Sequence, residues 1–193
     1  ALVVEHEAVA VCGASPASPA SFTPHIFFNL DGPGDGLIDG HRLQVFAEHL
    51  LTADADNVAT GTRIPMNGHA LDLRQPRRLG ELPDIDHAYE LVNAADGHSL
   101  RRVARAHSAV SGRAMEVWTT EPVMQVYTAG ALGSSTTPDV GKHGVVHRPR
   151  AGLCLEPQQY PNAVNCPAFP LNRVTVGQPY RARTEYRFGA LTS

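Results

Sequence analysis

The sequence is poor in the residues that mark several large classes of protein. Its 193 residues include 3 cysteines, and these lack the CxxC spacing of a zinc site or a redox motif. No apolar run approaches the length that spans a membrane, and the arginines are scattered rather than gathered in a basic stripe. The composition therefore argues against a disulfide framework, a membrane protein and a nucleic-acid-binding protein. Reduced thiols are expected of a cytoplasmic protein.

Several catalytic motifs are missing as well. The turn cluster 31–36 is rich in glycine but has no GK[ST], so it is not a phosphate loop. No GxSxG sequence marks a nucleophile elbow. His143 and His147 are four residues apart, but they lack a third ligand and the HExxH context, so we expect no metal there.

The residues that are present favour a β protein. The chain has 17 glycines and 15 prolines, and it suits one domain over residues 1–193. Residues 1–11 alternate as a strand does, residues 13–21 resemble a loose connector, and residues 41–53 fit either a helix or a strand. Short apolar runs then alternate with turn signals, which predicts a sandwich or barrel of antiparallel strands. These runs are Tyr89–Asn93, Leu100–Ala106, Ala114–Thr120, Val123–Thr128, Gly144–His147, Leu153–Glu156, Leu171–Val176 and Tyr180–Phe188.

Glu156 is the most informative residue of the chain. It is a carboxylate inside an apolar run, where an unpaired charge is costly and often has a task. A strand over Leu153–Glu156 places the two leucines on one face and Cys154 and Glu156 on the other. The segment Gln159–Pro170 is too rich in Pro and Asn for a helix or a central strand. The acid is therefore predicted beside a rigid loop, and the equal alternative is a partly buried Glu held by an Arg or by backbone donors.

Three more side chains could take part in chemistry. His25 lies next to aromatic residues, where burial would lower its pKa and leave it poised near neutrality. The alternative is a histidine at the edge of the core that bonds to the backbone. Asp86 enters a predicted strand together with His87, unless it is only a turn residue. Gln125 shares a strand face with apolar neighbours, so its amide needs partners that a hydroxyl-rich ligand would supply.

These residues fall within motifs that occur in one known family. Residues His25–Leu30 resemble the Asn-His-Thr-Tyr-Phe-Asn-Leu motif of aldose 1-epimerases, and Leu153–Gln158 is similar to the family's Gly-Phe-Cys-Leu-Glu-Thr-Gln stretch. The other matches follow in the family's order: Asp39–Val45, Leu71–Arg74, Asp86–Tyr89, Ser111–Arg113, Thr119–Pro122 with Gln125, Gly141–Lys142 and Tyr160–Ala163. The resemblance spans essentially the whole chain. It implies an all-β fold, a large antiparallel β-sandwich of the galactose mutarotase-like (supersandwich) type with a sugar in a concave cleft.

The resemblance also implies a function. The family interconverts the α and β anomers of free aldoses such as glucose and galactose, which needs an acid and a base but no metal, nucleotide or other cofactor. Carried over position by position, Glu156 would be the base and His25 the acid. Asp86 and Gln125 would hold sugar hydroxyls, and Phe27 would face the apolar side of the ring. The implied partner is a small-molecule sugar, not a nucleic acid or a membrane.

The sequence departs from the family pattern in several places. Pro24, Ile26 and Phe27 stand where the family has Asn, Thr and Tyr. Pro157 follows the glutamate in place of Thr. Family members carry a further N-terminal portion, so the resemblance implies an incomplete sandwich with open edges and exposed apolar side chains, first of all in Leu2–Val11. Two alternatives therefore stand beside the enzyme: a non-catalytic carbohydrate-binding member of the fold and an inactive fragment.

Overall fold

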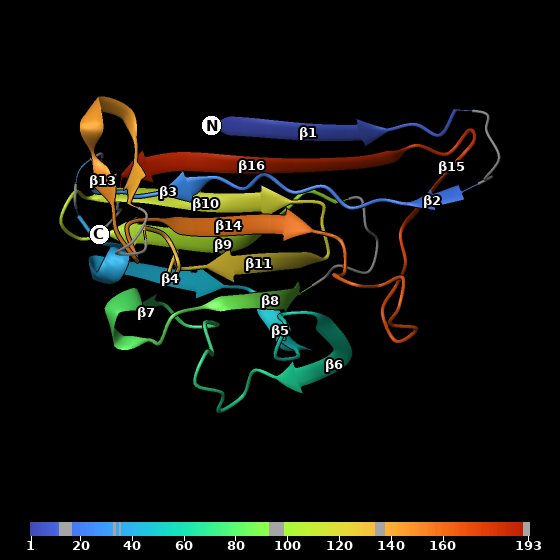
Figure 1. The fold of residues 1–193 in the computed structure, drawn as a ribbon, viewed down its shortest axis with the longest axis horizontal. Coiled ribbons are helices and arrows are strands. Elements are labelled where there is room, and N and C mark those ends of the chain that lie inside the picture. Colours follow the sequence, from blue (N-terminus) through green and yellow to red (C-terminus); the bar gives the residue numbers. More distant parts are fainter. Residues whose placement is uncertain (12–16, 33, 35, 93–98, 134–137, 191–193) are drawn as a thin grey trace.

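The computed structural model describes residues 1–11, 17–32, 34, 36–92, 99–133 and 138–190. Within them one six-stranded sheet has the order β1 (Leu2–Ala8), β16 (Tyr180–Ala190), β10 (Arg113–Thr119), β9 (Arg101–Ser108), β4 (His41–Val45) and β7 (Arg77–Arg78). A second has the order β3 (Phe27–Phe28), β14 (Leu153–Gln158), β11 (Val123–Tyr127), β8 (Asp86–Leu91), β5 (Ala47–Ala53) and β6 (Ala59–Pro65). Neighbouring strands are antiparallel, and most run along the long axis of the molecule (Figure 1).

Smaller elements complete the described chain. Two short ladders pair β12 (Asp139–Val140) with β13 (Val146–His147) and β15 (Arg173–Thr175) with β2 (Ala17–Pro19). Single 3-10 turns lie at Ile38–Gly40, Leu79–Glu81 and Lys142–Gly144. The all-β antiparallel fold class is therefore confirmed, and none of the described helices is long and apolar enough to cross a membrane.

The two large sheets share an apolar core. Leu153 and Leu155 of β14 belong to this core, and the hydroxyl of Tyr186 in β16 donates a 2.7 Å hydrogen bond to the Leu155 carbonyl. Residues that alternate with the leucines of β14 face away from the core, because successive strand side chains point to opposite faces. The predicted division of Leu153–Glu156 into two faces is thus confirmed, and it leaves Cys154 and Glu156 on the outer face of the second sheet.

The strand pattern differs from the expectation in several places, which include the unpredicted short strands β7 and β12. Residues 41–53 form two strands, β4 and β5, because the alternation of apolar residues prevails over the helical spacing. The connector predicted over 13–21 contains strand β2, and its residues 13–16 lie outside the described part, as does Cys12. Strand β6 was not predicted, since Gly61 and Pro65 interrupt its apolar pattern, and both residues are tolerated at the edge of a sheet.

Apolar side chains are exposed where β1 and β3 end their sheets. Strands β1 and β3 each stand at the end of their sheet's strand order. Leu2 is 41% exposed, and the ring of Phe188 is exposed beside Phe28. The expectation of exposed apolar side chains in Leu2–Val11 is confirmed, since Val3, Val9 and Val11 are exposed as well.

Candidate active site

The site is built from rows of side chains that cross three neighbouring strands. Residue Gln125 of β11 pairs with Glu156 of β14 on one side and with Ala88 of β8 on the other. In the next row, Tyr127 pairs with Cys154 and with Asp86. Paired residues in a sheet project to the same face, so these side chains gather on the outer face of the second sheet.

Glu156 is buried although it carries a carboxylate. The residue is 6% exposed, and burial raises the pKa of its carboxyl above the ordinary value. The nearby His25 imidazole pulls this pKa down and the Asp86 carboxylate pushes it up. Among the described residues, the basic group within ion-pair distance is His25 and not an arginine. The alternative interpretation named an arginine or backbone donors as the partner of this glutamate, and an arginine is not the partner observed.

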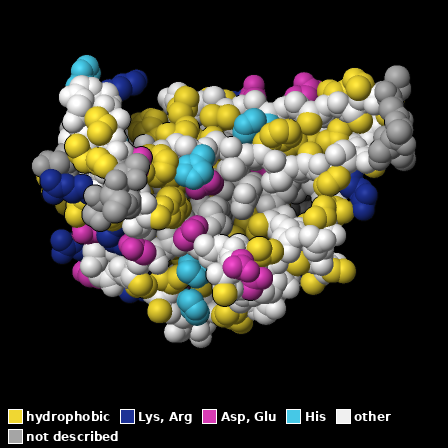
Figure 2. All heavy atoms as spheres, viewed as in Figure 1, with side chains coloured by type: hydrophobic (Ala, Val, Ile, Leu, Met, Phe, Trp, Pro, Cys, Tyr) yellow, Lys and Arg dark blue, Asp and Glu magenta, His cyan; other side chains and the backbone are white. Residues whose placement is uncertain are grey.

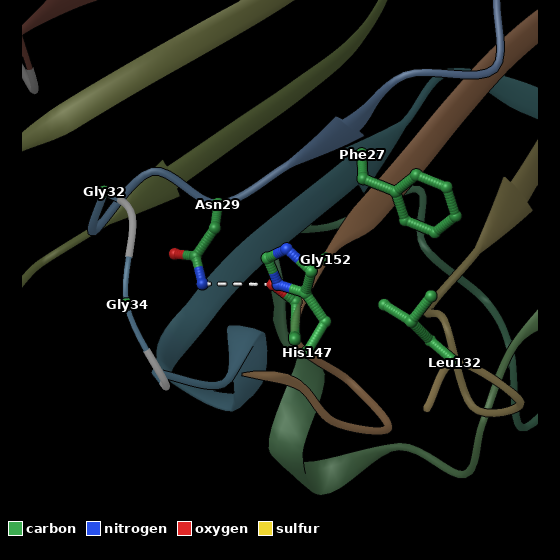
Figure 3. A pocket seen from close by; sticks show the side chains of 8 residues that line it. Phe27, Asn29, Gly32, Gly34, Leu132, His147 and Gly152 are labelled. Atoms are coloured by element: carbon green, nitrogen blue, oxygen red, sulfur yellow. Dashed lines mark hydrogen bonds between the residues drawn. The ribbon is translucent and has the colours of Figure 1, made fainter. Parts of the chain in front are cut away.

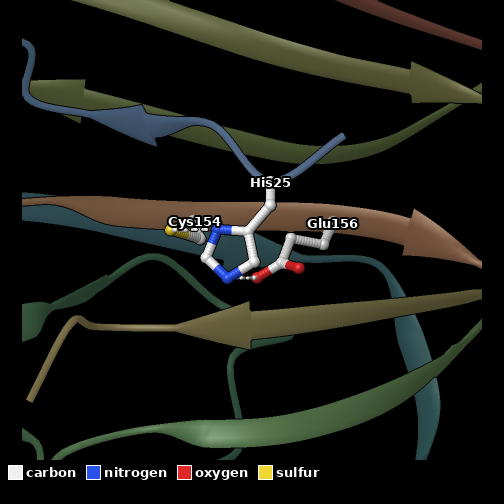
Figure 4. Close-up of side chains that lie close together, drawn as sticks. All are labelled: His25, Cys154 and Glu156. Carbon is white, nitrogen blue, oxygen red and sulfur yellow. Dashed lines mark hydrogen bonds and ion pairs between the residues drawn. The ribbon is translucent and has the colours of Figure 1, made fainter. Parts of the chain in front are cut away.

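His25 approaches Glu156 from the neighbouring segment of the same sheet. Phe27 of β3 pairs with Cys154, so continuing the antiparallel register places His25 beside Glu156. Its Nε2 lies 3.6 Å from Glu156 Oε1, and its Nδ1 lies 3.7 Å from Cys154 Sγ, as Figure 4 shows. The expected burial of His25 is wrong: its side chain is 53% exposed, because β3 is a two-residue strand at the sheet's edge.

The other three predicted residues lie around this pair. The Gln125 amide donates a 2.6 Å hydrogen bond to Asp86 Oδ1, which fixes both polar groups side by side. The Phe27 ring lies 5.1 Å from the His25 ring and 6.3 Å from that of Tyr127, centroid to centroid. The structure therefore brings together all five residues that the sequence singles out, from segments as far apart along the chain as those of His25 and Glu156. Their individual roles remain predictions.

Two hollows flank these side chains. A small cavity of 140 Å³ is lined by Asp86, Gln125, Asn57 and Pro161, among others. A second hollow of 360 Å³ is lined by Phe27, Leu132 and His147, among others. Asn29 also lines it, and its amide donates to the Ala151 carbonyl at 3.2 Å (Figure 3). Figure 2 shows histidine and acidic side chains near the middle of this view, whereas lysine and arginine lie toward its margins.

The loop after Glu156 covers the far end of the outer face. It contains neither helix nor strand over residues 159–170, as predicted. Tyr160 and Phe169 of this loop pack with Leu51 and Ala88 in a small apolar cluster. The Tyr160 hydroxyl donates a 2.6 Å hydrogen bond to Glu90 of β8, so the loop is tied to the same sheet that presents the site.

Glu90 is a second buried carboxylate on this face. Arg63 Nε lies 2.8 Å from Glu90 Oε1, and His49 Nδ1 lies 2.8 Å from Glu90 Oε2. Burial alone would raise the pKa of Glu90, but the hydrogen bonds from Tyr160 and Arg63 outweigh burial and lower the pKa. Arg63 also lies over the rings of Tyr160 and Phe169 at 5.5 and 5.0 Å from the centroids.

Cys154 is the neighbour of the site that sequence reasoning missed. The sequence places it on the strand face of Glu156 but gives it no role beyond that of a reduced thiol, and the structure places it free and fully buried beside His25. Burial raises the pKa of this thiol to about 12, and the carboxylates of Glu156 and Asp86 add to the effect. The alternation of residues in β14 puts Cys154 and Glu156 on one face. This pattern could have indicated that Cys154 lies beside the site.

The architecture and the site together define a class of protein. It is an antiparallel β-sandwich that presents a carboxylate–imidazole pair, with an acid and an amide beside it, on the outer face of one sheet. The model of the aldose 1-epimerase family matches residues 3–187 of the chain. The chain therefore belongs to the aldose 1-epimerase family.

Known relatives are about twice as long. Human galactose mutarotase is 37% identical over 181 residues, which are 91% of this chain and 51% of the human protein. Aldose 1-epimerase of Escherichia coli is 28% identical over 88% of this chain and 51% of its own length. The crystal structure of an aldose epimerase homologue from C. elegans superposes with a TM-score of 0.85 at 23% identity, over 98% of this chain and 56% of that one. The chain thus spans about half the length of the relatives it matches.

Proposed function

We propose that this chain carries the acid–base site of an aldose 1-epimerase and that it acts on free hexoses such as glucose and galactose. The observation that carries the proposal is the pair formed by Glu156 and His25, whose Oε1 and Nε2 atoms lie 3.6 Å apart. This separation is longer than an ordinary hydrogen bond. The two groups are therefore not hydrogen-bonded to each other, and both can bind a substrate.

The chemistry needs two proton transfers. Glu156 takes the proton of the anomeric hydroxyl while His25 protonates the ring oxygen, and the sugar ring opens. Rotation about the C1–C2 bond and closure on the other face give the second anomer, with each group returning its proton in the reverse sense. A carboxyl group whose pKa is raised is a stronger base when it is ionised, which suits it to this role.

The neighbouring residues suit substrate binding. Asp86 and Gln125 are joined by a 2.6 Å hydrogen bond and line the same small cavity, so they can hold adjacent sugar hydroxyls. Phe27 is 44% exposed, which leaves its ring free to stack on the apolar face of a sugar. The chain covers about half the length of its relatives. The proposal therefore includes only the side chains that this chain supplies.

A carbohydrate-binding member without catalysis is the second candidate. It is favoured by the exposure of His25, because an acid open to solvent has less of the water-excluded setting that active sites use. Sugar binding would then depend on Asp86, Gln125 and Phe27, and the carboxylate of Glu156 would not act as a base.

One experiment separates the two candidates. Polarimetry of freshly dissolved α-D-glucose or α-D-galactose measures the rate of anomerisation, and saturation-transfer NMR measures sugar binding. The catalytic function is supported if the chain accelerates anomerisation. Both Glu156→Gln and His25→Asn should then slow anomerisation while sugar binding persists. Binding without any acceleration supports the second candidate, and Glu156→Gln with full activity contradicts the assignment of the base.

A further inference from the structure

Cys154, His25 and Glu156 together form a set of metal ligands. One donor atom from each of the three side chains can be chosen so that all lie within 4.8 Å of one another. Figure 4 shows the imidazole between the thiol and the carboxylate, with both of these rising from the same strand, β14. We propose that this cluster binds Zn²⁺ as an inhibitor of the site rather than as a cofactor.

The spacing suits a tetrahedral ion. Zinc–sulfur and zinc–nitrogen bonds place two neighbouring ligands about 3.3 to 3.6 Å apart. The Nδ1 of His25 lies 3.7 Å from Cys154 Sγ, close to this range. The carboxylate of Glu156 needs a shift of about an ångström, and the half-exposed His25 ring can turn to allow it.

The mixture of donors selects the metal. Thiolate and imidazole ligands favour zinc and other soft or borderline ions, whereas Mg²⁺ and Ca²⁺ prefer oxygen ligands. Three protein ligands leave the fourth position of zinc to a water molecule. On binding, the Cys154 thiol becomes a thiolate and its proton passes to the solvent, so the step needs no oxidant or reductant.

The inhibition follows from the sharing of ligands. Glu156 and His25 are the groups to which the proposed function assigns proton transfer. A zinc ion would occupy a lone pair of the Glu156 carboxylate and would fix the His25 ring through Nδ1. Zinc and sugar therefore compete. The competition rests on the proposed function, whereas the binding of zinc depends on the cluster alone.

Cobalt spectroscopy tests the binding without any measurement of activity. Co²⁺ added to the purified, EDTA-treated chain is expected to give the visible bands of a tetrahedral site and a thiolate charge-transfer band in the near ultraviolet, and Zn²⁺ should bleach both. Cys154→Ser should abolish the charge-transfer band. His25→Asn, a change on an exposed ring, should lower Zn²⁺ affinity by about 10-fold or more, since even outer-shell changes cost this much.

Two matched variants control for other thiols. Cys166 is a buried residue of the loop over residues 159–170, and its thiol donates to the Ala59 carbonyl at 3.4 Å. Cys12 lies outside the described residues. Cys166→Ser and Cys12→Ser should each keep the cobalt spectrum. A spectrum lost in either of these variants but kept in Cys154→Ser would overturn the proposal, as would the absence of a thiolate band in the unchanged chain.

The competition is tested by repeating the zinc titration with sugar present. The apparent Kd for Zn²⁺ should rise in proportion to the concentration of D-galactose. A cobalt spectrum that depends on Cys154 but does not respond to sugar would keep the metal site and overturn its inhibitory role. An active chain without a metal spectrum would overturn the metal site and leave the proposed function intact.

Discussion

Glu156 and Glu90 are two buried carboxylates on one face of one sheet, and their environments are opposite. Glu90 is 9% exposed and accepts hydrogen bonds from Arg63 and Tyr160, with His49 at its other oxygen. Glu156 is 6% exposed and has His25 at 3.6 Å. The two side chains are therefore buried to nearly the same extent, but they differ in the number of hydrogen-bond donors around them.

The difference appears in the direction of the two pKa shifts. Burial acts to raise the pKa of both carboxyl groups. The donors around Glu90 outweigh burial, so the pKa of Glu90 is lowered. The groups near Glu156 do not outweigh burial, so the pKa of Glu156 is raised. Removing one partner of a compensated buried ion pair is destabilising, because the other charge is left without compensation. A carboxylate that is buried without such compensation costs stability and keeps its basicity for a substrate. The comparison teaches that the hydrogen-bond donors, rather than burial, decide the direction of each pKa shift.

The largest expected effect is on catalysis at Glu156. We expect Glu156→Gln to slow anomerisation by about 10²- to 10⁴-fold, because the amide keeps the shape of the side chain and loses the base. Polarimetry on α-D-galactose gives the rate, and the matched variant Glu90→Gln should keep most of the activity of the folded chain. Equal losses in the two variants would show that the comparison does not separate their tasks.

The next effect is on stability at Glu90. Glu90→Gln removes the charge that compensates Arg63 and weakens three contacts, so we expect a loss of about 1–3 kcal/mol in the free energy of unfolding. Urea denaturation at neutral pH measures it. Glu156→Gln is the control, and its stability should equal or exceed that of the unchanged chain. A destabilised Glu156→Gln together with an unaffected Glu90→Gln would reverse our assignment of the two acids.

A smaller effect is expected at the loop. Tyr160→Phe removes the hydroxyl that donates to Glu90 at 2.6 Å and leaves the ring packed against Phe169. We expect a loss of about 0.5–1.5 kcal/mol, typical of one hydrogen bond. Combining Tyr160→Phe with Glu90→Gln should cost less than the sum of the two, because one change removes the contact that the other weakens. Strict additivity in this double-mutant cycle would mean that the bond contributes nothing.

Much of the site was predictable from local patterns. Alternation within Leu153–Glu156 is enough to assign its two faces, since strand geometry has a fixed period of two. The same rule places Gln125 on a strand face with Tyr127. The family resemblance then links these segments to His25 and Asp86, and the antiparallel register of β14 with β11 and β11 with β8 brings them together.

The remaining features depend on contacts between distant segments. The exposure of His25 follows from its place at the edge of a sheet, which its aromatic neighbours in the sequence do not reveal. Arg63 and Tyr160 reach Glu90 across 27 and 70 positions, so no local pattern distinguishes Glu90 from Glu156. The contact between Cys154 and His25 spans 129 positions and is equally hidden.

The smallest effect we expect is a difference in how the two acids respond to pH. The pKa of Glu90 is lowered in the folded chain, so its contribution to stability is present above its unfolded pKa and is lost as the pH falls through the folded value. The pKa of Glu156 is raised from its ordinary 4.5, so its contribution is present below the unfolded pKa and is lost as the pH rises through the folded value. Urea denaturation between about pH 4 and pH 7, with EDTA present, should therefore show Glu156→Gln gaining stability over the unchanged chain as the pH rises, while Glu90→Gln falls further behind. Parallel curves for all three proteins would mean that neither carboxyl changes its affinity for protons on folding, and the contrast between the two environments would have no energetic consequence.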